Sequence, residues 1–339
     1  QKNHLLAEPM DIDNDGVLDL VTSVNTATST TNLKTEYEVY TLSGGSWVEK
    51  SGWKLPFRIE NTSSDEGKGG KGRDNYFRWV DLNADGFQDL VIGTTANGRL
   101  YDRFTNALVL AGNSSIAYRN MGAHGGGWQR DDSLRLPENL MVYDNYSYKD
   151  IGRRLVDLEG DGVIDVAESI LASNGAQVRH TYRQLTPGAS YRWNATPGLQ
   201  NPPASPYDFP QPLVDKDGES EVGLLFLDLN GDGLPDLTQH AGTSYRNTWI
   251  NQGGRGISPW VRESIPAAAS EETASYDPPL PLHDWSGVAR SYGNEFADIN
   301  GDGLVDIFYA SFSRSATPGP DNLAILNTGS GWLQREAWK

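Results

Sequence analysis

Apolar residues in this chain gather in short runs that recur between polar, Gly-rich stretches. Three of these runs, at residues 17–24, 87–94 and 304–310, are rich in Val, Leu, Ile, Phe and Tyr. Residues of these types favour β-strands, and the Gly and Asn residues around them favour tight turns. The pattern therefore predicts many short strands joined by turns.

An acidic motif begins just before each of these runs and overlaps it. Its first copy reads DIDNDGVLDL, and the form common to all copies is D-x-[DNE]-x-D-G-x-x-D followed by an apolar residue. The starts of the five copies are 70, 76, 71 and 70 residues apart, at Asp11, Asp81, Asp157, Asp228 and Asp298. A repeat at a nearly fixed period sets the architecture of a chain before any local feature does.

A second feature repeats in phase with the motif: a turn of small residues followed by an aromatic residue. The aromatic residues are Trp47, Trp128, Tyr191, Trp260 and Trp332. Each unit of about 70 residues thus contains a motif, two strands, a Gly turn, an aromatic strand and a final strand. About four antiparallel strands per unit is the make-up of a β-propeller blade.

The predicted fold class is all-β: a β-propeller of five blades, either a closed ring or part of a larger ring. We expect residues 1–339 to form one propeller domain that belongs to a larger protein. The repeat units span approximately residues 1–76, 77–152, 153–223, 224–293 and 294–339.

The motif has the composition of a calcium loop. Oxygen-bearing side chains at positions 1, 3, 5 and 9 and a backbone carbonyl at position 7 suit a hard cation, and the Gly at position 6 permits the sharp turn. We therefore predict up to five structural Ca²⁺ ions. The predicted ligands, with position 7 acting through its carbonyl, are Asp11, Asp13, Asp15, Val17, Asp19, Asp81, Asn83, Asp85, Phe87, Asp89, Asp157, Glu159, Asp161, Val163, Asp165, Asp228, Asn230, Asp232, Leu234, Asp236, Asp298, Asn300, Asp302, Leu304 and Asp306.

Two other interpretations of the motif fit less well. An EF-hand requires Glu at position 12 and a following helix, whereas only one copy has Glu there, at Glu168, and strands are predicted instead. Plain Asp-Gly and Asn-Gly turns do not account for five copies that keep acids at positions 1, 5 and 9.

The charge of the chain resides in these loops. The net charge is −17, from 45 Asp and Glu against 28 Lys and Arg, and the five motifs contain 17 of the acidic residues. The remaining scaffold is therefore near neutral, which favours metal sites over a generally acidic surface, because clustered carboxylates repel one another without a cation. We expect no nucleic-acid partner.

Other features place the chain more broadly. There is no Cys, and no apolar run is long enough to span a membrane. The chain begins at Gln1 with no Met and no signal peptide, so we expect a processed chain or an excised domain. Sequons at Asn61, Asn113, Asn145 and Asn194 fit a eukaryotic secreted protein.

FADINGDGLVDI in the last repeat resembles the FG-GAP/VCBS repeat, from which integrin α-subunit heads build a propeller with Ca²⁺ in the inter-strand loops. DLNGDGLPDL together with LNTGSGW is similar to the propellers in the SpvB/TcB-type portion of bacterial Tc and RHS/YD-repeat toxins. The resemblance implies structural Ca²⁺ on the motif residues and an extracellular or cell-surface location. Ala84 and Glu159 depart from the family pattern, but neither removes a ligand oxygen.

No catalytic motif stands out. The five His residues lack zinc-ligand spacing, and neither a G-x-S-x-G elbow nor a phosphate-binding Gly loop occurs. We expect a non-catalytic, calcium-stabilised module with a protein or glycan ligand, or with the other domains of a larger adhesion or toxin assembly as partners. The alternatives are a lectin that binds sugars through its top-face loops and a propeller hydrolase. The repeated Trp residues could stack on sugars, but their fixed place favours blade packing.

Overall fold

The computed structural model of the chain describes a large part of the sequence, and most of the regular structure in that part is β-strand. The residues described are 3–27, 32–62, 77–94, 99–102, 105, 107–111, 114–122, 127–137, 141–144, 147–150, 152–171, 177–182, 207–213, 224–241, 245–253, 259–262, 272–273, 275–279, 282–284, 290–291, 294–309 and 323–335.

The chain divides into two compact units. The first comprises residues 1–149 and 182–199, and the second comprises residues 150–181 and 200–339. Repeat one and nearly all of repeat two lie in the first unit, and the described parts of repeats three to five lie almost entirely in the second.

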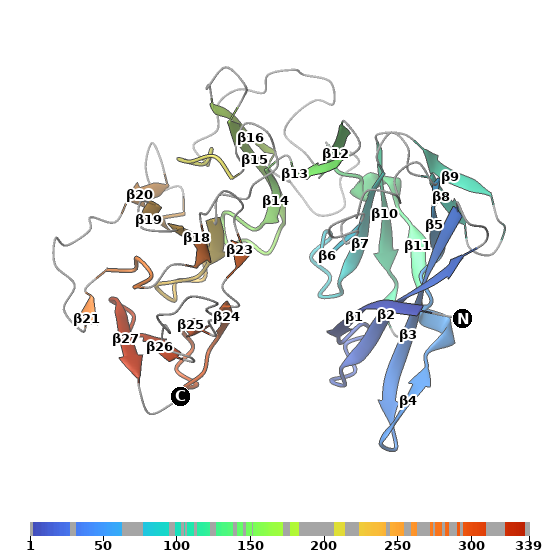
Figure 1. Ribbon diagram of the computed structural model, residues 1–339, viewed down its shortest axis with the longest axis horizontal. Helices are drawn as coiled ribbons and strands as arrows, with labels where there is room; N and C mark the ends of the chain where they lie inside the picture. Colours follow the sequence, from blue (N-terminus) through green and yellow to red (C-terminus); the bar gives the residue numbers. More distant parts are fainter. Residues whose placement is uncertain are drawn as a thin grey trace, which may run out of the picture. The chain divides into compact units, whose positions relative to one another are not determined.

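Repeat one forms an antiparallel sheet that begins with β1, β2, β3 and β4 (Figure 1). These strands are Asn3–Met10, Asp19–Ala27, Asn32–Ser43 and Ser46–Glu49. The N-terminal half of β3 also pairs with β5 (Phe57–Thr62), which continues the sheet to β8 (Arg99–Asp102) and β9 (Leu108–Ala111). Strands β8 and β9 belong to repeat two in sequence, so the sheet of repeat one includes two strands of repeat two.

Repeat two forms a four-stranded sheet in the order β11-β10-β7-β6. These strands are Trp128–Arg130, Ser114–Asn120, Asp89–Thr94 and Phe77–Val80. Side chains of both repeats share a buried cluster that includes Leu55, Phe57, Leu90, Ile116 and Tyr118. A two-stranded sheet of β12 (Met141–Asp144) and β13 (Ser147–Asp150) follows in sequence.

Repeats three, four and five repeat the same hairpin order. The described strands of repeat three are β14 (Arg153–Val156), β15 (Asp165–Leu171) and β16 (Gln177–Tyr182). Those of repeat four are β17 (Leu224–Leu227), β18 (Asp236–Ala241), β19 (Tyr245–Asn251) and β20 (Trp260–Arg262), with β22 (His283–Asp284) and β23 (Arg290–Ser291) added. Those of repeat five are β24 (Asn294–Ala297), β25 (Asp306–Tyr309), β26 (Leu323–Asn327) and β27 (Trp332–Arg335).

Neighbouring repeats of the second unit are joined as well. Strand β21 (Glu272–Thr273) belongs to repeat four in sequence but pairs with β27 of repeat five. Phe209, Leu237 and Trp260 lie in one buried cluster with side chains of repeats three and four, and Leu229, Ile325 and Trp332 lie in another with side chains of repeats four and five. The fold class is therefore the all-β, five-blade β-propeller that the repeats predict, with each motif in the first hairpin of its blade.

Three of the repeated Trp residues pack against the preceding repeat, as predicted. The indole Nε1–H groups of Trp128, Trp260 and Trp332 donate hydrogen bonds to the carbonyls of Trp53, Tyr207 and Tyr276, at 3.3, 3.2 and 2.9 Å. The prediction is wrong for Trp47, whose side chain is 51% exposed on the β3–β4 hairpin. Tyr191 lies outside the described residues.

This contrast sets up a matched pair of variants. We expect Trp332→Ala to lower the free energy of unfolding by about 3–5 kcal/mol, because it leaves a cavity in the buried cluster between repeats four and five. Trp47→Ala should cost less than about 1 kcal/mol, because its side chain already meets solvent. Denaturant unfolding of both variants would measure the difference, and equal losses would contradict the packing role of the repeated Trp.

Candidate metal-binding loops

Each motif closes the hairpin between the first two strands of its blade. The Asp at position 9 begins the second strand and pairs with the last residue of the first strand. The five pairs are Met10 with Asp19, Val80 with Asp89, Val156 with Asp165, Leu227 with Asp236, and Ala297 with Asp306. The register is thus the same in all five loops, and equivalent motif positions can be compared directly.

The Asp at position 1 holds the turn together. In the first loop, Asp11 Oδ1 accepts the N–H of Asp15 at 3.0 Å and Asp11 Oδ2 accepts that of Gly16 at 2.8 Å. Backbone donors in the last loop, with the Gly303 N–H foremost, lower the pKa of Asp298. The φ angle of the Gly at position 6 lies between 80° and 88° in every loop. Position 6 therefore requires the conformational freedom of Gly.

The Asp at position 5 accepts hydrogen bonds from other positions of the turn. In loops two, four and five, the Asn at position 3 donates its Nδ2–H to the Asp at position 5, at 2.9, 3.1 and 2.9 Å. The Asp at position 5 also accepts the N–H of position 7 at 2.8–3.0 Å in all five loops. The position-7 residues that donate this N–H are Val17, Phe87, Val163, Leu234 and Leu304.

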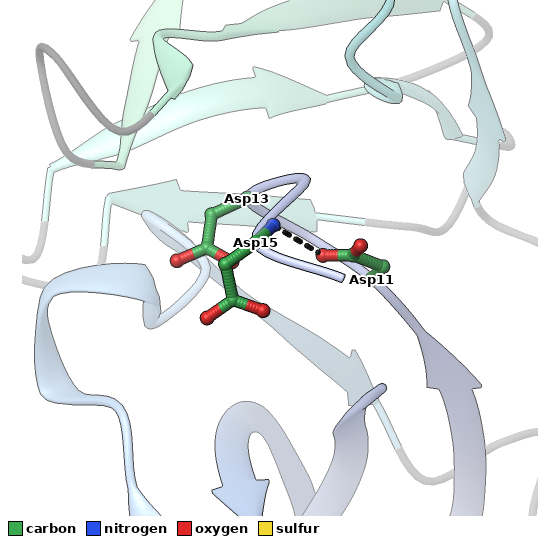
Figure 2. Close-up of side chains that lie close together, drawn as sticks. All are labelled: Asp11, Asp13 and Asp15. Atoms are coloured by element: carbon green, nitrogen blue, oxygen red, sulfur yellow. Dashed lines mark hydrogen bonds between the residues drawn. The ribbon is translucent and has the colours of Figure 1, made fainter. Parts of the chain in front are cut away.

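The first loop gathers its carboxylates most closely. Asp11, Asp13 and Asp15 each place a carboxylate oxygen within 4.8 Å of the others (Figure 2). No second group of three acidic or His side chains this close is found in the described part of the chain, so Glu159 is not brought into such a group with Asp157 and Asp161. Oxygen donors of this kind suit Ca²⁺ by their chemistry.

The Asp at position 9 is the most deeply buried carboxylate of every motif. Its side chain is at most 3% exposed in all five loops. Its Oδ2 atom accepts the N–H of position 2, from Ile12, Leu82, Leu158, Leu229 and Ile299, at 3.4, 3.1, 3.3, 2.9 and 2.9 Å. Burial raises the pKa of Asp89 and of Asp236 to about 7, against the opposing effect of these backbone donors. A cation nearby would favour the ionised form.

An Asn at the end of the third strand links this buried Asp to the preceding blade. Asn120, Asn251 and Asn327 donate their backbone N–H to Oδ1 of Asp89, Asp236 and Asp306, at 2.9, 2.8 and 2.7 Å. Their Nδ2–H groups reach the position-2 carbonyls of Ile12, Leu158 and Leu229 in the preceding loop, at 2.9, 2.9 and 2.7 Å. Sequence reasoning missed this role, although the Asn-x-Gly that follows the third strand marks all three.

Position 4 of a loop also contacts the next loop along the chain. Asn14 donates its Nδ2–H to the carbonyl of Gly86 at 2.7 Å. A Cβ atom on Gly160 would come within 2.6 Å of Leu234, and one on Gly231 within 2.8 Å of Leu304. The motifs are therefore packed in a row within each unit, with little room between them.

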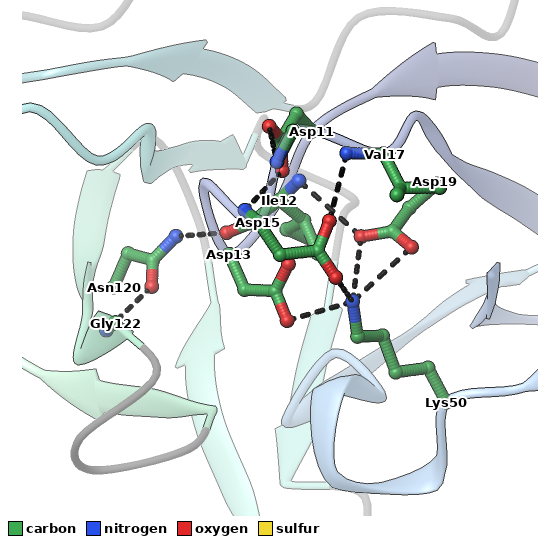
Figure 3. A network of polar contacts seen from close by, with 10 residues as sticks. Asp11, Ile12, Asp13, Asp15, Val17, Asp19, Lys50, Asn120 and Gly122 are labelled. Carbon is green, nitrogen blue, oxygen red and sulfur yellow. Dashed lines mark hydrogen bonds and ion pairs between the residues drawn. The ribbon is translucent and has the colours of Figure 1, made fainter.

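A lysine that sequence reasoning also missed enters the first loop. Lys50 Nζ lies 2.7 Å from Asp13 Oδ2, 3.0 Å from Asp19 Oδ2 and 3.8 Å from Asp15 Oδ2 (Figure 3). Burial opposes the charge of Lys50, but the bonds to Asp13 and Asp19 outweigh it and raise the pKa of the amine. No spacing rule points to this residue, because it lies 31 positions beyond Asp19.

The structure describes the side chains of two histidines, His180 and His240. His240 is buried, and its Nδ1 atom lies 2.7 Å from the carbonyl oxygen of Pro278. His180 Nδ1 lies 3.5 Å from Glu168, whose carboxylate also accepts a bond from Arg153 at 3.1 Å. Both side chains thus have protein partners.

Neither the protein-family models nor the curated proteins yield a match for this chain. Among the described residues, no helix has the length and apolar character needed to span a bilayer. The resemblance to FG-GAP/VCBS repeats therefore stays a hypothesis that rests on the motif.

The Asn link should contribute measurably to stability. We expect Asn327→Ala to cost about 2–4 kcal/mol, because it removes the bond to the Leu229 carbonyl and the one that Asn327 Oδ1 accepts from Gly329, and leaves buried groups unpaired. The neighbouring exposed Thr328→Ala is the control and should cost less than about 1 kcal/mol. Denaturant unfolding checks both, and a neutral Asn327→Ala would contradict the link.

Loop two carries strain that can be relieved. Ala84 at position 4 has a φ of 57°, a conformation that costs a residue with a Cβ about 1–2 kcal/mol. We expect Ala84→Gly to raise the free energy of unfolding by about 0.5–1 kcal/mol. Ala107→Gly, at an exposed site without positive φ, should lower it instead. The same sign for both variants would show that the strain at Ala84 is negligible.

Proposed function

We propose that this chain is a calcium-stabilised, non-catalytic β-propeller of the FG-GAP/VCBS type. It would act as a binding or structural module within a larger extracellular or cell-surface protein, in the manner of the integrin-type and Tc/RHS-type propellers that its motif resembles. The observation that carries this proposal is the five-fold recurrence of one oxygen-rich hairpin in one register.

The electrostatics of the loops support a bound divalent cation. All of the excess negative charge of the chain lies in the motifs, since the remaining 28 acidic residues balance the 28 basic ones. In the first loop the carboxylate oxygens at positions 1, 3 and 5 lie within 4.8 Å of one another, and position 9 adds a buried carboxylate in every loop. Ca²⁺ would neutralise this group of carboxylates, which repel one another when no cation is present.

Ca²⁺ suits the donor set better than Mg²⁺ or Zn²⁺. The predicted ligands are all oxygens, and no Cys exists in the chain. The loops also differ from one another in their side chains at position 3, which is Asp13, Asn83, Glu159, Asn230 or Asn300. Ca²⁺ accepts such variation, whereas Mg²⁺ requires a tight octahedron. The same variation should give the loops different affinities.

The proposed dependence on Ca²⁺ bears on where the protein is located. Loops that need Ca²⁺ for their stability fit a compartment in which calcium is plentiful, which favours the outside of the cell. The ligand would be a protein or a glycan, or another domain of the same assembly. The rigid blades would present the connecting segments to it, because binding residues usually lie on loops held by a rigid scaffold.

Calcium removal tests the proposal. We expect the melting temperature to fall when millimolar Ca²⁺ is replaced by excess EGTA, because a ligand at a hundredfold excess over its Kd stabilises a folded protein by about 2.7 kcal/mol per site. Asp232→Asn and Asp302→Asn should reduce this calcium-dependent shift. In EGTA they should cost little, because each removes one negative charge from a repelling group.

Asp132→Asn is the matched control. It makes the same change at an exposed Asp outside the motifs, which pairs with Arg130 at 2.9 Å. This variant should keep the full calcium-dependent shift. An unchanged melting temperature in EGTA, together with no bound calcium in the purified protein by metal analysis, would rule the proposal out.

A further inference from the structure

Lys50 brings a positive charge to the place where the motif predicts a metal ion. It follows β4, donates its backbone N–H to the Val39 carbonyl at 2.7 Å, and precedes the 3-10 helix η1 (Ser51–Trp53). Its side chain is only 16% exposed and ends among the carboxylates of positions 3, 5 and 9 in loop one (Figure 3). These carboxylates belong to Asp13, Asp15 and Asp19.

We propose that the ammonium group of Lys50 takes the place of Ca²⁺ in loop one, so that this loop stays metal-free at calcium concentrations that fill the other loops. The inference rests on the proposed function, because it assumes that the motif elsewhere binds Ca²⁺. The two cations exclude each other, since both would use the same oxygens. Lys50 Nζ lies 2.7–3.2 Å from oxygens of Asp13 and Asp19.

The side chains of loop one differ from those of its counterparts in a way that fits this exchange. Loops two, four and five have Asn at position 3, and its Nδ2–H donates to the Asp at position 5. Asp13 cannot donate when it is ionised, so the donor must come from elsewhere. Lys50 supplies a positive charge in its place: Nζ is nearest to Asp13, at 2.7 Å, and forms a longer ion pair with Asp15, at 3.8 Å. The Asn of loops two, four and five is thus replaced in loop one by an Asp and a Lys.

The charge count alone would lead to the opposite expectation. Loop one carries four Asp, whereas loops two, four and five carry three each. More carboxylates normally strengthen Ca²⁺ binding, so the sequence ranks loop one among the tightest sites. The ammonium group of Lys50 offsets one of these charges. It also competes with Ca²⁺ for the carboxylates, because it already lies among them. The first loop should therefore be the weakest site despite its charge.

The corresponding residue of repeat two does not play this role. Asp131 occupies the same backbone position, with its N–H bound to the Ala117 carbonyl at 3.0 Å before η3 (Asp132–Leu134). Its side chain caps η3 by accepting the N–H of Ser133 at 2.9 Å. In repeat five the corresponding residue is Arg335, whose side chain lies outside the described residues. At the rim of loop two, Arg119 contacts Asp85 at 3.1 Å and is 43% exposed.

Counting bound calcium in a Lys50→Met variant tests the inference. Met keeps the length of the side chain without its charge. We expect calcium-stripped Lys50→Met to bind one Ca²⁺ per chain more than the wild type in equilibrium dialysis with radioactive calcium. Lys54→Met is the matched control, because Lys54 is a nearby lysine that forms an ion pair with Glu49, which lies outside the motifs. It should bind as many ions as the wild type.

The outcomes separate this inference from the proposed function. The number of ions bound by the wild type tests the proposed function, whereas the difference between Lys50→Met and wild type tests the role of Lys50. Equal numbers and equal affinities in the two proteins would overturn the inference, whatever the wild-type number is. One additional ion in the variant would support the role of Lys50, whereas a wild type that bound no calcium would contradict the proposed function.

Melting curves provide a second measurement that does not depend on counting ions. In EGTA, Lys50→Met should melt at least about 2 °C below the wild type, because the four Asp of loop one lose their nearest cation. Added Ca²⁺ should close this gap. If Lys50→Met does not fold in EGTA, Lys50→Gln serves in its place, since Gln keeps a hydrogen-bond donor without the charge. A gap that Ca²⁺ leaves unchanged in the variant that folds would contradict the inference.

Discussion

A buried carboxylate at position 9 of every motif is the constraint on which the rest of each blade depends. Burying a charge is costly unless hydrogen bonds or an opposite charge compensate it. The side chain of this Asp is at most 3% exposed, yet it accepts a backbone N–H from position 2 in all five loops. These donors compensate only in part, because burial still raises the pKa of Asp89 and Asp236 to about 7. The acidic side chains at positions 1 and 5 of the same two loops raise these pKa values further, and a positive charge close to the turn would oppose the rise.

The same Asp connects one blade with the next. Asn327 donates its backbone N–H to Asp306 and its side-chain N–H to the Leu229 carbonyl of the preceding loop, and Asn120 and Asn251 repeat the arrangement. A change of charge or geometry in one loop therefore alters the hydrogen bond to the position-2 carbonyl of the preceding loop. Repeat proteins gain stability from contacts between adjacent units as well as within them. Within each unit, the loops thus contribute to that contact and are more than surface turns.

The sequence was sufficient for the features that depend on spacing. The period of the motif gave the blades, the residues after Gly gave the second strands, and positions 1, 5 and 9 gave the residues that fold around the turn. It was not sufficient for features set by packing between distant segments. Asn120 meets Ile12 across 108 residues and Lys50 meets Asp19 across 31. The recurring Asn-x-Gly marks the Asn but not its partner, and no repeated pattern marks Lys50. The exposure of Trp47 was missed for a related reason: blade packing places the other described Trp residues of this repeat position against the preceding repeat, and this one lies on an exposed hairpin.

The five loops satisfy one electrostatic requirement with different side chains. At position 3, three loops use a neutral Asn that donates to its neighbour, one uses Glu159, and the first uses Asp13 with a lysine from elsewhere in the blade. The backbone register and the buried Asp stay the same in all of them. What the repeat preserves is therefore a hairpin with acidic side chains at positions 1, 5 and 9, and we propose that the source of the compensating charge differs between loops. A metal ion and a tethered ammonium group are two ways to supply it, and only the first makes the stability of a blade depend on calcium.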